Sequence, residues 1–132
     1  MNKRRVDKNI GNAYEILQDK NIGIAVDGKI SKGYRGQIST FGAAISSGSL
    51  LAAVAFFSDK GNAQVNRDRL MKAIMELVKR NHESVKEKEL FFYIKNHSGS
   101  EAQNMRLKEE ILDYAIAIKL AMNLYILTED ER

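Results

Sequence analysis

The segment Gly23–Lys29, GIAVDGK, has the spacing of a phosphate-binding loop. Such a loop, G-x-x-x-x-G-K, surrounds a phosphate with backbone N–H groups, and a Ser or Thr after the lysine binds magnesium. Here Ile30 occupies that last position, and the segment follows a predicted helix, whereas a phosphate loop follows a buried strand. We therefore interpret this segment as an ordinary loop between helices.

A second group of reactive residue types surrounds His97, which is followed directly by Ser98. Together with Tyr93 and Lys95, His97 has the chemistry of a metal-free ribonuclease. Neighbours in a chain rarely point at each other, however, and we find no carboxylate placed to orient the imidazole. A turn between two helices is the simpler interpretation, and we predict no catalytic site.

Acidic residues and histidines offer no better case for a metal or cofactor site. Glu109, Glu110 and Asp113 cluster on a predicted amphipathic helix, where such carboxylates usually form a solvated face. The chain has no cysteine and only two histidines, His82 and His97, too few ligands for a metal centre. We predict no metal, no cofactor and no enzymatic activity.

Basic residues are the remaining candidates for chemistry. Residues 1–80 carry 14 Lys and Arg against 7 Asp and Glu, whereas residues 81–132 carry 7 against 10. A patch suited to a phosphate backbone forms if folding brings the basic residues together, and scattered solubilising charge is the open alternative. The predicted nucleic-acid-binding residues are Lys3, Arg4, Arg5, Lys8, Lys32, Arg35, Arg69 and Lys72.

The elements that must position these residues are predicted to be helices. The sequence contains no proline, and Gly, Asn and Ser separate stretches of helical periodicity. We predict an all-α fold, a compact bundle of about five to six helices in a single domain, residues 1–132. The expected helices span about residues 3–19, 34–46, 49–58, 63–80, a short one at 90–94, and 100–128.

Two of these helices have features that predict how they pack. The helix at 49–58 is apolar nearly all round, which predicts burial on most sides, and Lys60-Gly61 should close it. The helix at 34–46 carries a stripe of small residues that predicts a close approach of another backbone. The stripe consists of Gly36, Thr40, Ala43 and Ser47.

The segment from Tyr34 to Gly61 also resembles a known family. In this segment a predicted helix begins at a tyrosine and ends near a glycine turn, and an apolar helix follows that ends at Lys-Gly. This order resembles the small helical subunit of the type III-B CRISPR effector, the Cmr complex. The matching residues are Leu50, Ala53, Ala55, Phe56, Lys60 and Gly61. The chain departs from the family pattern at Ala43, at Ser47 and in its acidic tail, TEDER.

The resemblance implies a noncatalytic protein whose copies stack along an RNA-guided ribonucleoprotein in antiviral defence. Its implied partners are the backbone subunits, the large subunit, copies of itself, the guide RNA and the target RNA. The apolar run at 111–127 contains charged residues and is short for a bilayer span, so no membrane partner and a cytoplasmic location are expected.

Two alternatives follow from the same residues. One is a small subunit of another CRISPR effector, and the other is a small helical nucleic-acid-binding protein or nuclease outside CRISPR. A DNA-reading helix would begin near residue 64, where Gln64, Asn66, Arg67 and Arg69 occur in its first turns. If Arg35, Arg69 or Lys72 contacts phosphate, its replacement by Ala is expected to weaken RNA association uniformly across sequences and to flatten its salt dependence.

Overall fold

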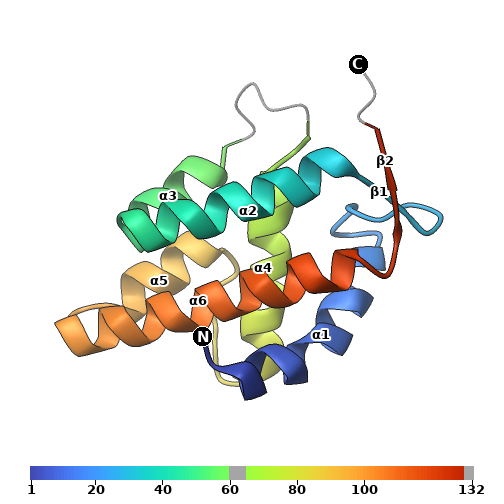
Figure 1. The fold of residues 1–132 in the computed structure, drawn as a ribbon. Coiled ribbons are helices and arrows are strands. Elements are labelled where there is room, and N and C mark those ends of the chain that lie inside the picture. The colour runs from blue at the N-terminus through green and yellow to red at the C-terminus, as the bar shows by residue number, and fades with distance from the viewer. Residues whose placement is uncertain (60–64, 130–132) are drawn as a thin grey trace.

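Six α-helices and one small parallel sheet make up the computed structural model of the chain, which describes residues 1–59 and 65–129 (Figure 1). The predicted helical bundle is therefore confirmed, with a two-stranded sheet added to it. The elements in chain order are α1 (Lys3–Gln18), β1 (Lys29–Ser31), α2 (Lys32–Ser47), α3 (Leu50–Phe57), α4 (Asp68–Asn81), α5 (Leu90–His97), α6 (Glu101–Met122) and β2 (Ile126–Thr128).

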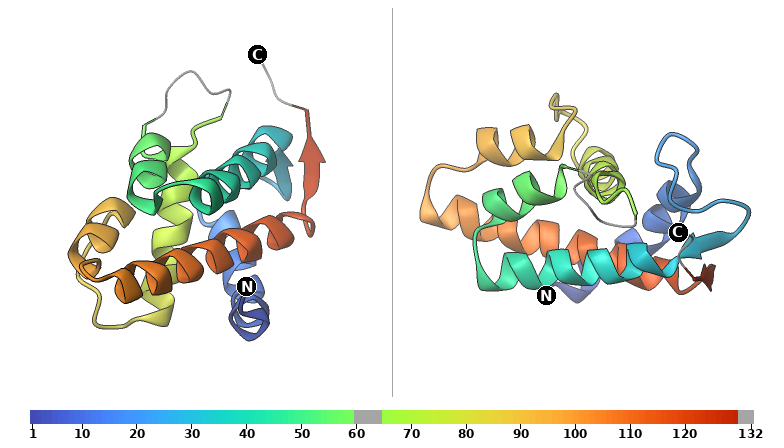
Figure 2. Two further views of the ribbon diagram at one scale, coloured as in Figure 1. Left: turned by 60° about the vertical axis from the view of Figure 1, so that its left-hand side comes forward. Right: turned by 90° about the horizontal axis from the view of Figure 1, so that it is seen from above.

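The long helix α6 lies at the centre of the packing, because it contacts α1, α2, α4 and α5 (Figure 2). Its apolar side chains meet those of α1 and α2, and fully buried members of this core include Leu17, Phe41, Ile111 and Ile118. None of the helices in the described part of the chain is long and apolar enough to cross a membrane.

Polar side chains cap the starts of several helices, and these are residue types that favour the position before a helix. The Ser49 hydroxyl accepts a hydrogen bond from the backbone N–H of Ala52 at the start of α3. Ser100 and Gln103 form a complete capping box at the start of α6, each satisfying a backbone N–H that has no partner within the helix. The proposed closure of α3 by Lys60-Gly61 lies outside the described residues.

The predicted end of the last helix, near Thr128, is wrong. The helix stops at Met122, and residues 126–128 form β2, which pairs in parallel with β1 so that Lys29 lies opposite Ile126 and Ile30 opposite Leu127. The helical pattern hides this pairing, because its two strands are three residues long and far apart in sequence. Ile30 is fully buried, which anchors the sheet to the core.

The expected burial of α3 on most sides is also wrong. Ala53, Val54 and Phe57 are buried, but Leu51 is 36% exposed and Phe56 is 60% exposed. The helix packs on α2, α4 and α5 on one side only, so an apolar composition produces a half-exposed helix here. Packing in the core therefore does not account for the apolar side chains on the exposed side of α3.

The stripe of small residues on α2 is exposed and is not packed against another backbone of residues 1–59 and 65–129. All four of its residues are exposed, and a Cβ added at Gly36 would meet no atom within 4 Å. The Thr40 hydroxyl donates to the Gly36 carbonyl at 3.0 Å, and the Ser47 hydroxyl donates to the Ala43 carbonyl at 2.8 Å. The predicted packing role is therefore absent from the part of the chain that the structure describes.

The loop that mimics a phosphate-binding loop is held by a side chain from α4. Gly23 and Gly28 have φ values of 74° and 76°, which favour glycine. The Arg69 guanidinium donates to the Gly23 carbonyl at 2.6 Å and to the Tyr34 hydroxyl at 3.3 Å. Arg69 is thus a structural residue that ties the loop and α2 to α4.

Helix α4 itself begins at Asp68, later than predicted, and Ala63 and Gln64 lie outside the described residues. Arg67, one of the residues that a DNA-reading helix would present, is 9% exposed. Its guanidinium donates to the Asp59 carbonyl at 2.8 Å and lies 4.2 Å from the centre of the Phe56 ring. The start of α4 is therefore engaged in internal contacts.

We expect Arg69→Ala to lower the free energy of unfolding by about 1–3 kcal/mol, because it leaves the Gly23 carbonyl without its donor. Lys72→Ala is the matched control on the same helix. The Lys72 side chain is 62% exposed and lies 3.9 Å from Asp68, so its loss should cost under about 0.5 kcal/mol. Urea unfolding measures both changes, and equal costs would contradict the structural role of Arg69.

Candidate nucleic-acid interface

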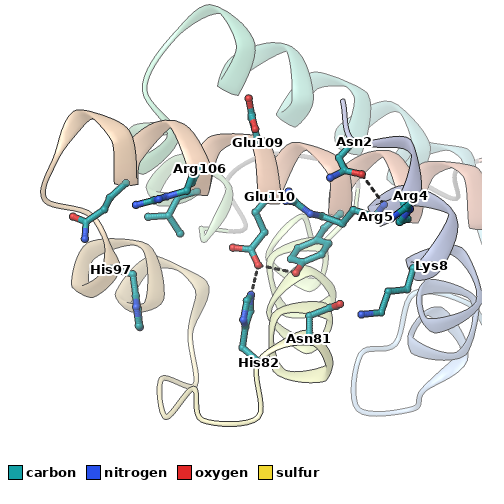
Figure 3. Close-up of a pocket in the computed structure, with 13 residues that line it drawn as sticks. Asn2, Arg4, Arg5, Lys8, Asn81, His82, His97, Arg106, Glu109 and Glu110 are labelled. Atoms are coloured by element: carbon teal, nitrogen blue, oxygen red, sulfur yellow. Dashed lines mark hydrogen bonds and ion pairs between the residues drawn. The ribbon is translucent and has the colours of Figure 1, made fainter.

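A hollow of about 620 Å³ lies between the start of α1, the end of α4 and the first half of α6 (Figure 3). We call it the basic pocket. Its cationic lining comes from elements far apart in the chain. The basic residues that line it are Arg4, Arg5, Lys8, His82, His97 and Arg106.

The first turns of α1 bring three of the predicted cations to this pocket. The side chain of Asn2 caps the helix by accepting from the Arg5 N–H at 3.1 Å. Arg5 itself pairs with Asp113 at 3.2 Å, and that carboxylate is 1% exposed. Arg5 therefore joins α1 to α6. Arg4 and Lys8 lie one helical turn apart and are exposed. Neither forms an ion pair with another described residue.

The floor of the basic pocket is a buried carboxylate, Glu110 of α6. It accepts hydrogen bonds from the Tyr114 hydroxyl at 2.7 Å and the Tyr93 hydroxyl at 3.1 Å, and it pairs with the Nε2 atom of His82. Figure 3 shows His82 pointing up at this carboxylate from below α6. The expectation that Glu110 and Asp113 form a solvated face is wrong, because both are at most 9% exposed; Glu109 is exposed as expected.

The two phenols beside Glu110 remain protonated donors. Burial, together with the neighbouring Glu110 carboxylate, raises the pKa of Tyr93 well above its ordinary value, and the same causes raise the pKa of Tyr114. Neither hydroxyl can therefore act as a base near neutral pH. Both oxygen atoms of the Glu110 carboxylate therefore have hydrogen-bond partners within the fold.

His97 differs from the sequence interpretation, because a carboxylate does lie beside it. Its Nε2 atom is 3.3 Å from Glu87, which precedes α5, and the Tyr93 ring lies 4.7 Å from the imidazole centre to centre. Hydrogen bonds from Asn96 and His97 lower the pKa of Glu87 below its ordinary value. Among the described residues, no group of three or more His, Asp and Glu side chains is placed to bind a metal ion.

Arg106 is a residue of the basic pocket that sequence reasoning missed. It lies in the acidic half of the chain, so counting charges along the sequence hides it. The available signal was its spacing, because Arg106 precedes Glu110 by four residues on one helix and therefore shares a face with it. Arg106 is exposed, and like Arg4 it makes no ion pair with the described residues.

Most of the other predicted cations lie away from the basic pocket, so the predicted residues do not form one patch. Lys32 forms an ion pair with Glu129 at 2.7 Å. Lys32 and Arg35 line a separate hollow of about 250 Å³. The Nε atom of Arg35 is buried and has no hydrogen-bond partner among the described residues. Lys72 borders a third hollow. Lys3 is exposed beside the basic pocket without lining it.

Residues 7–122 match the family model described as CRISPR-associated protein (Cas_Cmr5). The chain belongs to this family. The match spans every helix apart from the first residues of α1 and stops at the end of α6, before the small sheet is completed by β2. No curated protein and no solved structure matches the chain.

Membership confirms the resemblance that the Tyr34–Gly61 segment carries, because that segment lies within the matched residues. The chain is thus a small subunit associated with the Cmr type of CRISPR effector. Its basic pocket contains residues from both ends of the matched region, since Lys8 and Arg106 both fall within it.

We expect Glu110→Ala to lower the free energy of unfolding by about 3 kcal/mol, because two buried hydroxyls and His82 lose their acceptor. The neighbouring Glu109→Ala removes an exposed carboxylate of the same pocket and should change stability by less than about 0.5 kcal/mol. Urea unfolding at neutral pH compares the two variants. A Glu110→Ala cost no larger than that of Glu109→Ala would show that the buried network does not stabilise the fold.

Proposed function

We propose that this protein is a noncatalytic small subunit of an RNA-guided type III-B ribonucleoprotein. In this role, copies of the chain stack along the complex in the cytoplasm and help to hold the guide–target RNA duplex during antiviral defence. The match to the Cmr5 family over residues 7–122 is the observation that carries the proposal. Backbone subunits, the large subunit and both RNAs are the proposed partners.

The basic pocket supports contact with the RNA backbone. Arg4, Lys8 and Arg106 are exposed on its rim and uncommitted to carboxylates in the described structure. Cations on flexible side chains bind phosphates without reading sequence, which suits a subunit that must accept any guide. The amides of Asn81 and Gln103 add hydrogen-bonding groups to the same lining.

The state of the polar side chains supports a binding role over a catalytic one. Glu110 already accepts from Tyr93, Tyr114 and His82, and the raised pKa values of the tyrosines keep them protonated. A general base needs a free acceptor with a pKa near the working pH. We accordingly assign cleavage to other subunits of the complex.

Affinity purification of the tagged protein from its own cells tests the assignment. We expect recovery of the effector subunits together with guide RNAs that carry repeat-derived tags. The identity of the co-purified subunits separates type III-B from another CRISPR effector. Recovery of the protein alone, or RNA cleavage by the isolated chain that is lost in His97→Ala, would contradict the proposal.

The basic pocket is tested by the salt dependence of RNA binding. Arg4→Ala, Lys8→Ala and Arg106→Ala should each weaken binding for every sequence and reduce the slope of log affinity against log salt by roughly 0.7–0.9 for each phosphate that is no longer neutralised. Lys20→Ala, an exposed lysine beyond the other end of α1, is the control and should leave the slope unchanged. Lys32→Ala and Arg35→Ala measure the separate hollow in the same assay. Unchanged slopes for all three pocket variants would exclude the pocket as the RNA-binding surface.

A further inference from the structure

A groove runs between α2 and α6, which lie side by side and run in opposite directions (Figure 1). Two neighbouring hollows form it. The first, of about 250 Å³, is lined by Arg35 and Gly36, and the second, of about 260 Å³, is lined by Gly42 and Leu112. Ser39 lines both hollows, which makes them continuous. We call the two hollows together the α2–α6 groove.

The floor of the α2–α6 groove is aliphatic. Ile38 and Ala115 are buried in it, while Leu112 and Ile116 are half-buried and line it. Among the described residues, no aromatic side chain lines either hollow. RNA duplexes are bound mainly through their phosphates, and single strands are bound by stacking of bases on aromatic rings. An aliphatic floor therefore favours a protein occupant over RNA.

The charged residues of the groove are all cations. Lys32, Arg35 and Lys119 line it, whereas no aspartate or glutamate of the described chain does so. Lys32 pairs with Glu129, but Arg35 and Lys119 form no ion pair with a described residue. The groove is therefore complementary to a surface that carries carboxylates beside apolar side chains.

Two glycines of α2 line the groove, although the fold of the chain itself does not call for them. Glycine is unfavourable inside a helix, because it gains the most freedom on unfolding. A Cβ added at Gly36 would meet no atom within 4 Å, and one added at Gly42 would meet only the Leu112 side chain, at 4.0 Å. Neither glycine has a positive φ. Both leave room for another backbone to approach α2 closely from outside.

We propose that the α2–α6 groove binds an acidic amphipathic helix of a different protein subunit. The apolar side of that helix packs on the aliphatic floor, its carboxylates pair with Arg35 and Lys119, and its backbone lies against Gly42. Residues 32–46 of α2 border the groove and rise about 21 Å, which matches about four turns of a second helix. This inference rests on the proposed function in that it names the chemistry of a partner subunit.

Carbodiimide cross-linking of the effector complex, purified from its own cells, tests this contact. The reagent joins an amine directly to a carboxylate, so it links only groups that touch. We expect mass spectrometry to find Lys119 joined to an Asp or Glu in a helical segment of another subunit. Lys119→Arg is the matched control, since it keeps the charge but has no amine that forms an amide, and it should lose this adduct while the complex remains intact.

Other occupants give different results in the same experiment. An intact complex without a Lys119 adduct, or with Lys119 joined to a second copy of this chain, would overturn the proposal. Ultraviolet cross-linking of the bound RNA to residues of α2 would identify RNA as the occupant and would equally overturn it.

The glycines provide a second measurement that separates docking from folding. Gly42→Ala should raise the melting temperature of the isolated chain, because alanine favours a helix. The same variant should bind at least about fivefold more weakly to effector complex from cells that lack this chain, because the added methyl group overpacks the contact. Gly11→Ala is the matched control. Gly11 is exposed on α1 and a Cβ there also meets no atom within 4 Å, so this variant should raise the melting temperature and leave binding unchanged.

Unchanged binding of Gly42→Ala, or a lower melting temperature of the isolated variant, would show that the glycine serves no partner. These failures are distinct from a failure of the proposed function. If guide RNA and effector subunits co-purify but the Lys119 adduct is missing, only the contact proposed for the α2–α6 groove is wrong. If they do not co-purify, the proposed function fails, and this contact fails with it.

Discussion

The structure depends on two buried carboxylates that lie three residues apart on α6. A buried carboxylate is costly unless hydrogen bonds and opposite charge surround it. Asp113 is satisfied by Arg5 and by the backbone N–H of Asn2, which fixes the start of α1. Glu110 is satisfied by Tyr93, Tyr114 and His82, which fixes α5 and the end of α4. Together they join three other helices to α6 at one place.

The arginines and lysines of the chain fall into two groups, those that make contacts inside the fold and those that remain on the surface. Arg5 and Arg69 are used inside the fold, the first on Asp113 and the second on the loop at Gly23. Arg4, Lys8 and Arg106 remain on the surface without ion-pair partners among the described residues. The Glu110 carboxylate at the floor accepts hydrogen bonds from Tyr93 and Tyr114, whereas the exposed cations on the rim face outward and can attract an anion.

At the end of the molecule where the sheet lies, an aliphatic side chain is exposed, since Ile126 is 63% exposed. The small sheet closes the end of the fold at which α6 finishes, and only three residues of each strand are needed for this. Pairing β1 with β2 places Ile126 outward and Leu127 toward the bundle, because successive side chains of a strand point to opposite faces. One short ladder thus both completes the core and creates an apolar surface beyond it.

Local patterns in the sequence were enough to predict that the chain is helical, that Ser49 and Ser100 cap helices, and which family it resembles. These features are local, because helical periodicity and capping depend on residues within a few positions of one another. The apolar residues of α4 likewise recur at helical spacing, and Leu70, Ile74 and Leu77 are fully buried.

Which polar residues are buried, and which apolar residues are exposed, depends on contacts between distant parts of the chain. Glu110 and Asp113 have the sequence pattern of a solvated face, but their donors come from α1, α4 and α5 as well as α6. The pairing of Ile30 with Leu127 and the gathering of Arg106 with Arg4 join residues about a hundred positions apart. Such contacts leave no local periodicity, since they depend on how whole helices pack against one another.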